Sequence, residues 1–321
     1  MSALKVSLVY RKVSARAAIF QLLVTLVCYV SLLWSAVALA DQIWLCLPLM
    51  AACGLAAVRL YMLQHDCMHR CFIRPRWLND TIGILLSPFT LTPFYMGRYN
   101  HNQHHSHVGD LDRRDTFEIN VMTVQEFRDA SPRQRVLYRL YRSPLTLLVV
   151  GPFLVYGIVH RFPKNTIKAG LLWDVFLHNL LVVGYLTVVY LVFGGQGLAV
   201  LFGAIYCGVS MGAFIPYVEH NFETIHWGRR PELDPQTAAL RASAVLDFGN
   251  VFHWVTANIG FHDLHHLNPN IPSYNLKRAY AALERDGLLQ SHKITFRQGL
   301  GCLKWKLWDE EQQKMVGFAA L

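Results

Sequence analysis

Long apolar runs alternate with strongly polar stretches along this chain. Residues 17–63 contain only two charged side chains, and residues 170–218 contain only one, Asp174. By contrast, residues 107–143 carry 13 charged side chains. An apolar excess confined to a few runs is typical of membrane-spanning helices and not of a large soluble core. The pattern excludes a soluble enzyme and a disordered tail.

Four segments of these runs are long enough to cross a bilayer as helices. At 1.5 Å per residue, each would extend roughly 31 to 36 Å. Only two or three residues separate the members of each pair, so we expect two hairpins whose turns lie on one side of the membrane. The predicted spans are residues 17–40, 43–63, 171–193 and 197–218.

The basic residues predict the orientation of these hairpins. Four Lys or Arg precede the first span, and residues 64–143 contain eleven Arg. Basic residues collect on the cytoplasmic side of membrane proteins. We therefore expect an all-α integral membrane protein with four transmembrane helices, cytoplasmic termini and a cytoplasmic helical cap. No repeat or linker divides the sequence, so residues 1–321 should form a single membrane domain.

Other apolar segments are expected not to span the membrane. Residues 81–97 and 144–159 contain proline, and the second segment would reach only about 24 Å as a helix, so both should lie at the interface. An alternative interpretation treats residues 1–40 as a cleaved signal, because Ala38-Leu39-Ala40 resembles a cleavage site. That apolar run, however, exceeds the roughly 7 to 15 residues of a signal core.

Neither the charge nor the cysteine content changes this picture. The net charge of +9 does not indicate nucleic-acid binding, because the bases lie beside apolar spans and form no stripe among aromatic residues. Seven cysteines without a CxxC pair, four of them inside apolar runs, imply no disulfide framework.

Nine of the 15 histidines form a pattern that suits metal binding. Three clusters have the sequences HDCMH, HNQHH and HDLHH, and a further histidine stands alone. Roughly 0.03 HxxHH strings are expected by chance at this composition, and two occur. On a helix, positions i, i+3 and i+4 share one face, so each string directs its imidazoles at a common point. The nine are His65, His69, His101, His104, His105, His220, His262, His265 and His266.

The predicted topology brings these histidines to the cytoplasmic side together. Nine imidazoles are too many for one ion but suit two metals with four or five nitrogens each. Neutral imidazole binds Fe, Cu, Zn and Ni alike, so the ligands alone do not choose the metal. The six other histidines do not repeat the chelating spacing and are expected to be packing residues.

Several polar residues close to these histidines are candidates for supporting the metal ligands. A ligating histidine usually donates its second N–H to a carboxylate or carbonyl. Solvation of the acids is an equally good interpretation. Asp174 and His178 lie one turn apart inside the third span. An ionisable pair there indicates a function, but Asp174 is close enough to the helix end to reach the membrane surface by snorkelling instead. The candidates are Asp66, Asp263, Glu219, Glu223 and Asn258, the last as a possible oxygen donor to the site.

The three clusters, in this order and separated by apolar hairpins, resemble the histidine boxes of the integral-membrane fatty acid desaturase family. The segment NIGFHDLHHLNPNIPSYNL at residues 258–276 is similar in particular to bacterial acyl-lipid desaturases of the delta-12 or omega-6 type. Shorter similar segments are TLTPF at 90–94, GDLDRRD at 109–115, YRLYRSPL at 138–145 and PYVEHNFE at 216–223. The resemblance covers roughly residues 60–280.

This resemblance implies a non-haem di-iron centre, two iron ions held by the nine patterned histidines. Such a centre uses O₂ as co-substrate and removes two hydrogens from adjacent methylenes of a fatty acyl chain. An unactivated C–H bond offers a general base nothing acidic, so a metal oxidant is needed. The acyl carrier stays open between membrane lipid, acyl carrier protein and coenzyme A. We expect a ferredoxin- or rubredoxin-type electron donor with a reductase, and a location in the bacterial inner membrane.

The chain departs from the pattern of the bacterial omega-6 group at two positions. Met68 stands where that group usually has Gly, and Asp263 stands where the third box often has a further His. Both lie beside the expected metals, so hydroxylation, acetylenic bond formation and terminal alkene production remain alternatives to desaturation. Outside this reaction class, a metal transporter would place ligands near the bilayer midplane, and an inactive scaffold would not need intact boxes.

Overall fold

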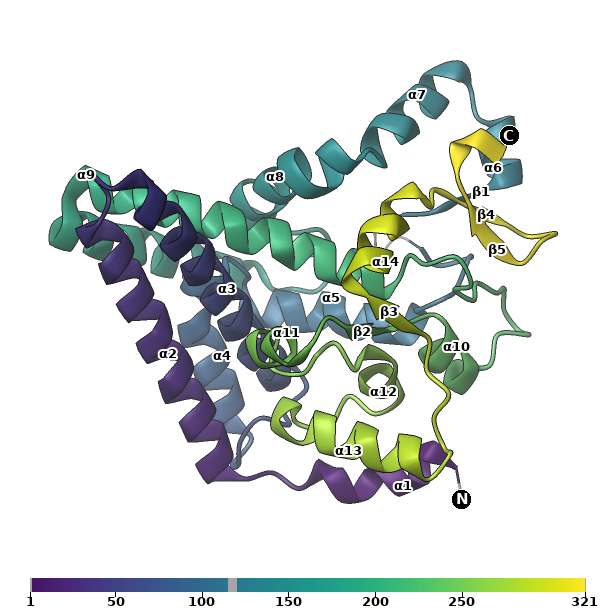
Figure 1. The fold of residues 1–321 in the computed structure, drawn as a ribbon, viewed down its shortest axis with the longest axis horizontal. Coiled ribbons are helices and arrows are strands. Elements are labelled where there is room, and N and C mark those ends of the chain that lie inside the picture. Colours follow the sequence, from purple (N-terminus) through teal and green to yellow (C-terminus); the bar gives the residue numbers. More distant parts are fainter. Residues whose placement is uncertain (1, 115–119, 321) are drawn as a thin grey trace.

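The computed structural model describes residues 2–114 and 120–320, which are mostly helical with a few short strands (Figure 1). Within these residues, three helices are long and apolar enough to cross a membrane: α2 (Ala15–Ala38), α3 (Ile43–Met68) and α9 (Leu172–Glu219).

The other elements are shorter. The helices are α1 (Ala3–Ser7), α4 (Trp77–Thr90), α5 (Phe94–His107), α6 (Val124–Asp129), α7 (Pro132–Tyr141), α8 (Gly151–Gly157), α10 (Pro235–Arg241), α11 (Asn250–Val255), α12 (His262–Leu267), α13 (Ser273–Arg285) and α14 (Phe296–Gly301). The strands are β1 (Met122–Thr123), β2 (Val245–Asp247), β3 (Lys293–Thr295), β4 (Leu307–Asp309) and β5 (Lys314–Val316). Single 3₁₀ or π turns are η1 (Leu8–Arg11), η2 (Thr146–Val150), η3 (Val159–Arg161), η4 (Cys302–Lys304) and η5 (Phe318–Ala320).

The chain of α9 reverses direction at Gly194, which has a φ of 65°. Glycine adopts this left-handed conformation without strain, and a right-handed helix cannot continue through it. Both ends of α9 lie at α5: Asp174 accepts a hydrogen bond from a backbone amide of α5, and His220 has its ring centroid 4.8 Å from that of His104. A straight helix of 48 residues would separate its ends by about 72 Å. Within the described residues, α9 therefore folds back on itself as a hairpin of two apolar segments, next to the hairpin of α2 and α3. That four segments span a membrane stays a prediction.

Both hairpin turns lie at the same end of this bundle, which is on the left in Figure 1. Gln196 in the second turn donates a hydrogen bond to Asp41 in the first at 3.3 Å. Nearby, the rings of Trp34 and Phe193 have centroids 5.2 Å apart. These contacts place the two turns beside each other, and their position on one side of a membrane stays a prediction.

The helix α3 continues beyond the predicted end of its span at residue 63. Its last turn is buried by protein, so polar side chains there find partners inside the fold. Gln64 donates to the carbonyl oxygens of Gly83 and Thr92 at 2.9 and 3.2 Å, and its own oxygen accepts from the Thr90 hydroxyl at 2.8 Å. These bonds attach α3 to α4 and to the turn before α5. An apolar-run criterion cannot detect such an extension.

The helix α3 and the second half of α9 pack in close backbone contact. A Cβ added to Gly54 would lie 2.4 Å from the carbonyl oxygen of Ala204, and one added to Gly208 would lie 2.8 Å from the carbonyl oxygen of Gly54. Small residues at such positions let membrane helices approach closely.

The part of the chain away from the hairpin turns forms a cap of short helices and strands (Figure 1). Strands β2 and β3 pair in parallel, and β1, β4 and β5 form a sheet in the order β1-β4-β5. Buried Arg142 donates to the Asn221 side chain at 2.7 Å and to the Trp305 carbonyl at 3.1 Å. This arginine therefore joins α7 to the segments after α9 and before β4.

Residues 144–159 fold as η2 and α8 and pack against α9. The segments 132–141 and 146–161 meet at an angle of 57°, and together they are apolar and long enough to form a further span. The interfacial position expected for residues 144–159, and likewise that for residues 81–97, stays a prediction.

Candidate metal centre

The first two histidine clusters are carried by α3 and α5. His65 lies in the last turn of α3 and His69 is the residue that ends it. The helix α5 begins after Pro93, which has no polar side chain to satisfy the first amide groups of the helix. Buried Asp174, from the first turn of α9, supplies the missing acceptor at 2.8 Å from the Met96 amide. The Asp174–His178 pair thus contributes through Asp174 to the position of α5.

The remaining histidines come from the end of α9 and from α12. His262, His265 and His266 lie on one short helix whose residues are all buried. His220 follows α9, and its Nδ1 lies 2.8 Å from the carbonyl oxygen of Ala242. A proton on Nδ1 donated to this carbonyl makes Nε2 the nitrogen that offers its lone pair to a metal.

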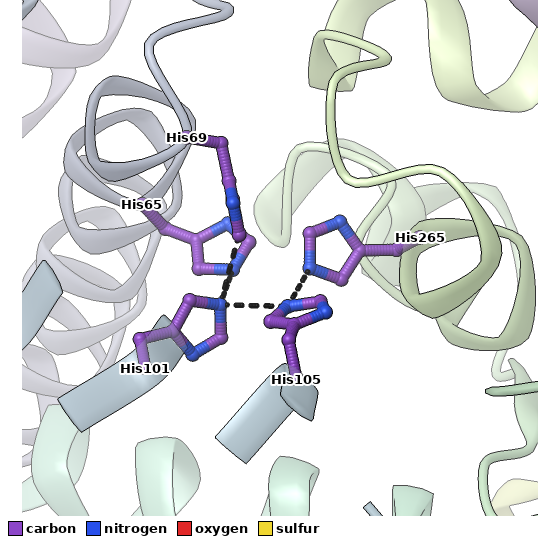
Figure 2. Close-up of side chains that lie close together, drawn as sticks. All are labelled: His65, His69, His101, His105 and His265. Carbon is purple, nitrogen blue, oxygen red and sulfur yellow. Dashed lines mark hydrogen bonds between the residues drawn. The ribbon is translucent and has the colours of Figure 1, made fainter. Parts of the chain in front are cut away.

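All nine predicted histidines meet in two groups, and within each group the ligand atoms lie within 4.8 Å of one another. The first group is His65, His69, His101, His105 and His265, and the second is His104, His220, His262 and His266. Figure 2 shows the rings of the first group turned toward one another from α3, α5 and α12. His104 lies in a different group from its neighbours His101 and His105. Likewise, the HDLHH cluster is divided between the two groups, so the expectation that each string directs its imidazoles at one common point is wrong for HNQHH and HDLHH.

The separations between ring nitrogens fit metal chelation. The Nε2 atom of His101 lies 2.8 Å from that of His65 and 3.0 Å from those of His69 and His105. A ring nitrogen carries at most one N–H, so these contacts cannot all be hydrogen bonds. Metal–imidazole bonds of about 2.1 Å at near right angles place adjacent ligand atoms about 3.0 Å apart.

The second group has the same spacing. The Nε2 atom of His262 lies 2.9 Å from that of His220 and 3.0 Å from that of His266. The Nε2 atoms of His266 and His104 are 3.2 Å apart. The donor sets therefore fit two metal ions bound through Nε2.

Burial, followed by the neighbouring histidines, lowers the pKa of six of these imidazoles, all outside the membrane-spanning helices, well below the usual range. The lowered pKa keeps these six rings neutral, which is the form that binds metal. These six are His69, His101, His105, His262, His265 and His266.

Only one of the predicted supporting residues faces a histidine of either group. Buried Glu219 places Oε2 at 3.5 Å from Nδ1 of His262. Asp66 instead accepts a hydrogen bond from the amide of Ser273 at 2.8 Å, and the Asn258 side chain donates to the Ser273 carbonyl at 3.0 Å. Both therefore anchor the start of α13.

The two remaining candidate acids are Asp263 and Glu223. Asp263 accepts hydrogen bonds from the Ser291 hydroxyl and from the Leu264 amide, and burial raises its pKa to about 6. Glu223 is exposed. Neither acid contacts a histidine of the two groups through a described hydrogen bond or ion pair.

The six other histidines lie outside both groups, as expected for packing residues. His253 stacks on Phe261 with ring centroids 4.4 Å apart, and His292 stacks on Phe222 at 4.7 Å. His160 packs at 4.7 Å against Tyr156.

A cavity of about 370 Å³ adjoins both histidine groups. His65 and His101 line it from the first group, and His104, His220 and His262 line it from the second. The other lining residues include the polar Arg142, Asn221 and Trp227 and the apolar Met62, Leu147, Pro152, Val155 and Ile215. The wall chemistry suits a long apolar ligand with one polar end.

Met68 stands one layer behind this cavity. A Cβ added to Gly97, which lines the cavity, would lie 2.8 Å from the terminal methyl group of Met68. Met68 is buried but is not itself a lining residue. Any effect of Met68 on a ligand must therefore act through Gly97 and α5.

Sequence reasoning missed most residues of the cavity wall. Tyr61 lies one helical turn before His65, with ring centroids 6.5 Å apart, and that spacing could have identified it. No sequence signal separates buried Arg142 from the exposed arginines around it.

Residues 42–299 match the family model described as fatty acid desaturase, and this range includes all nine histidines. The chain therefore belongs to the fatty acid desaturase family, whose members are oxidoreductase enzymes. The resemblance inferred from the histidine clusters is confirmed. The long apolar helices of the chain are those of an integral membrane protein.

The similar proteins include desaturases from bacteria, cyanobacteria and plants. The chain is 32% identical over 264 residues to a fatty acid desaturase from Bacillus subtilis (strain 168), covering 82% of this chain and 74% of that protein. It is 27% identical to an sn-1 acyl-lipid omega-3 desaturase (ferredoxin) from Nostoc sp. (strain 36), covering 70% of this chain and 63% of the relative. It is 25% identical to an sn-1 oleoyl-lipid 12-desaturase from Synechocystis, covering 76% and 70%.

Proposed function

We propose that this chain is an O₂-dependent fatty acyl desaturase with a non-haem di-iron centre, which introduces a double bond into an acyl chain. The observation that carries the proposal is the convergence of nine histidines in two groups beside a largely apolar cavity. Membership of the fatty acid desaturase family supports the same reaction class.

Each histidine group would hold one iron, through five imidazoles in the first and four in the second. The irons would supply the oxidising chemistry that an unactivated C–H bond requires. Overall, two hydrogen atoms from adjacent methylenes, two electrons and two protons convert O₂ to two water molecules. The two electrons come from an external carrier.

The protein's own contribution is to hold the ligands and to position the acyl chain. The carboxylate of Glu219 and the carbonyl of Ala242 orient His262 and His220 from the side away from the metal. The cavity wall keeps two adjacent methylenes beside the histidine groups and excludes water from them. Arg142 and Asn221 mark the end that would receive the polar part of the substrate.

The names of two similar proteins support a proposal for the substrate and the electron donor. One relative is named for an acyl-lipid and for ferredoxin, and another for an oleoyl-lipid. We propose an acyl chain of a membrane lipid as substrate and a ferredoxin-type donor with its reductase, with rubredoxin as the alternative donor. Acyl carrier protein and coenzyme A esters are the alternative substrates.

We also propose that residues 1–321 form one domain in the bacterial inner membrane, with four spans and with both termini and the metal centre cytoplasmic. The hydrogen bond between the two hairpin turns supports a common side for them. Cysteine labelling at residues 42 and 195 should report the periplasm, and labelling at 120 and 300 the cytoplasm. Opposite locations for 120 and 300 would mean that residues 144–159 contribute a span.

The deciding experiment is mass spectrometry of lipids and headspace from a bacterial host that expresses the chain. We expect a new double bond, and close to two irons per purified chain. His265→Ala should abolish the product, whereas His292→Ala, at a stacked histidine outside both groups, should not. A hydroxylated, acetylenic or terminal-alkene product would instead identify the chain as the enzyme that forms that product. Full activity of His265→Ala would refute the di-iron assignment.

A further inference from the structure

Arg59 is a charged side chain in the apolar part of α3. It and Asp41 carry the only charges in residues 17–63. A charged residue in such a segment either has a function inside the protein or extends its side chain to the membrane surface. Arg59 is only 3% exposed, so its guanidinium group does not reach the surface. Its partners lie inside the fold and indicate its role.

These partners come from two other helices. The Nε atom of Arg59 donates to the hydroxyl of Thr25 at 3.1 Å, and Nη2 donates to the side chain of Gln21, both on α2. The guanidinium carbon lies 4.4 Å from the ring centroid of Trp254 on α11, which is within range for a cation–π contact. Arg59 forms no ion pair with an acid of the described residues. Neutral groups and one aromatic ring therefore surround this charge.

The contact with Trp254 lies close in sequence to the third histidine cluster. Trp254 stands eight residues before α12, which begins at His262, and α11 packs against α3 (Figure 1). On the other side of α12, the amide of Ser273 donates to Asp66 of α3 at 2.8 Å. Arg59 and Asp66 are seven residues apart, so they lie on nearly the same face of α3, two turns from each other. One face of α3 thus holds both ends of the segment 254–273.

We propose that Arg59 positions α12 against α3 through its cation–π contact with Trp254. The inference rests on the proposed di-iron centre, because α12 supplies ligands to both histidine groups. The helix α3 carries His65 and His69, so its two contacts with the segment 254–273 set the distance between these ligands and those of α12. Arg59 is a positioning residue, since none of its described contacts is with a histidine.

Competition between the purified full chain and a chelator for ferrous iron, without O₂, tests this role. Arg59→Met and Trp254→Leu should each weaken the binding of both irons about three- to tenfold, the factor that corresponds to a partly desolvated cation–π contact. Because both changes remove the same contact, the double variant should bind iron no more weakly than either single variant. Arg59→Lys keeps a charge at the ring and should bind iron nearly as tightly as wild type.

Two control variants remove the same chemical groups from exposed positions. Arg278→Met removes an exposed arginine of α13, and Trp44→Leu removes a tryptophan of α3 that is 84% exposed. Neither change should alter iron binding. A loss of affinity confined to Arg59 and Trp254 would therefore not be an effect of net charge or of tryptophan content.

A second measurement needs no metal. Amide hydrogen exchange in the metal-free protein reports local opening of the segment 254–273. Arg59→Met and Trp254→Leu should both speed exchange there severalfold and leave exchange in α9 unchanged. If Arg59 served only to join α2 to α3, Arg59→Met would lower the melting temperature, but Trp254→Leu would change neither the exchange of this segment nor iron binding.

The outcomes separate this inference from the proposed function. Unchanged exchange and iron affinity in Trp254→Leu would overturn the positioning role, and so would losses in the double variant that equal the sum of the single losses. If Arg59→Met does not fold, Trp254→Leu is compared with Trp254→Phe, which keeps an aromatic face and should restore most of the affinity. A wild-type chain that binds no iron would refute the di-iron proposal, and hydrogen exchange alone would then decide whether Arg59 positions α12.

Discussion

Replacement of Glu219 should weaken one metal position and leave the other intact. Its carboxylate faces Nδ1 of His262, a member of the second histidine group, and no member of the first group lies in an ion pair with it. Loss of a carboxylate that holds a ligating histidine typically costs about 10- to 100-fold in metal affinity, which is about 1.4 to 2.7 kcal/mol. Because the 3.5 Å separation leaves Nδ1 of His262 without a hydrogen bond in the described structure, we expect an effect at the lower end of this range, about tenfold for Glu219→Gln and more for Glu219→Ala.

Iron stoichiometry under competition with a chelator measures this difference. Wild type should release its two irons at similar chelator concentrations, whereas Glu219→Ala should lose one iron about tenfold or more earlier and retain the other. Glu223→Ala is the matched control, because this acid lies four residues further along and is exposed. A Glu219→Ala protein that holds both irons as tightly as wild type would refute the supporting role of the carboxylate, and loss of both irons together would refute the independence of the two groups.

Three further changes have defined outcomes. Asp174→Ala should lower the free energy of unfolding by roughly 1 to 3 kcal/mol, because a buried amide of α5 loses its acceptor. The melting temperature should fall and iron binding should weaken with it. Unchanged stability would contradict the capping role. Met68→Gly should change chain-length preference or product ratio without loss of iron, since space opens behind Gly97, and an identical product profile would leave Met68 as a packing residue. Metal-free protein should lose stability as the pH falls below about 6.5. The buried histidines have lowered pKa values in the folded protein, so the unfolded chain, with its usual histidine pKa of about 6.5, binds protons more readily. Chemical denaturation at neutral and acidic pH measures this loss, and a stability that does not change with pH would contradict it.

The sequence predicts much of the fold because its main signals are local. Apolar runs of spanning length identify α2, α3 and both halves of α9, and glycines at the second turn agree with the reversal at Gly194. The end of α3 is not predictable in this way, because Gln64 and its neighbours are polar residues whose partners lie in distant segments. Helical spacing likewise identifies the histidines of the three clusters, although not the isolated His220. It cannot assign His104 and His101 to different groups, since that depends on how α12 and the end of α9 approach α5.

Supporting residues are the hardest part of the site to predict. Asp66, Asp263 and Glu219 are equally close to histidines in sequence, yet only Glu219 faces one. The difference is one of side-chain direction, which proximity along the chain does not determine. The same holds for Arg142 and Tyr156, whose positions at the cavity depend on packing between elements far apart in sequence.

The distribution of the histidines along the chain constrains the order in which the enzyme matures. Both groups include residues of α12, so neither is complete until the ribosome has synthesised residues 262–266, about four fifths of the way along the chain. The first hairpin must enter the membrane long before that, with His65 and His69 still lacking their partners. Delivery of the proposed irons before that point would therefore meet incomplete binding sites, so tight binding of both ions has to follow the synthesis of α12. A nascent chain truncated before α12 should be inserted in the membrane yet bind no iron tightly.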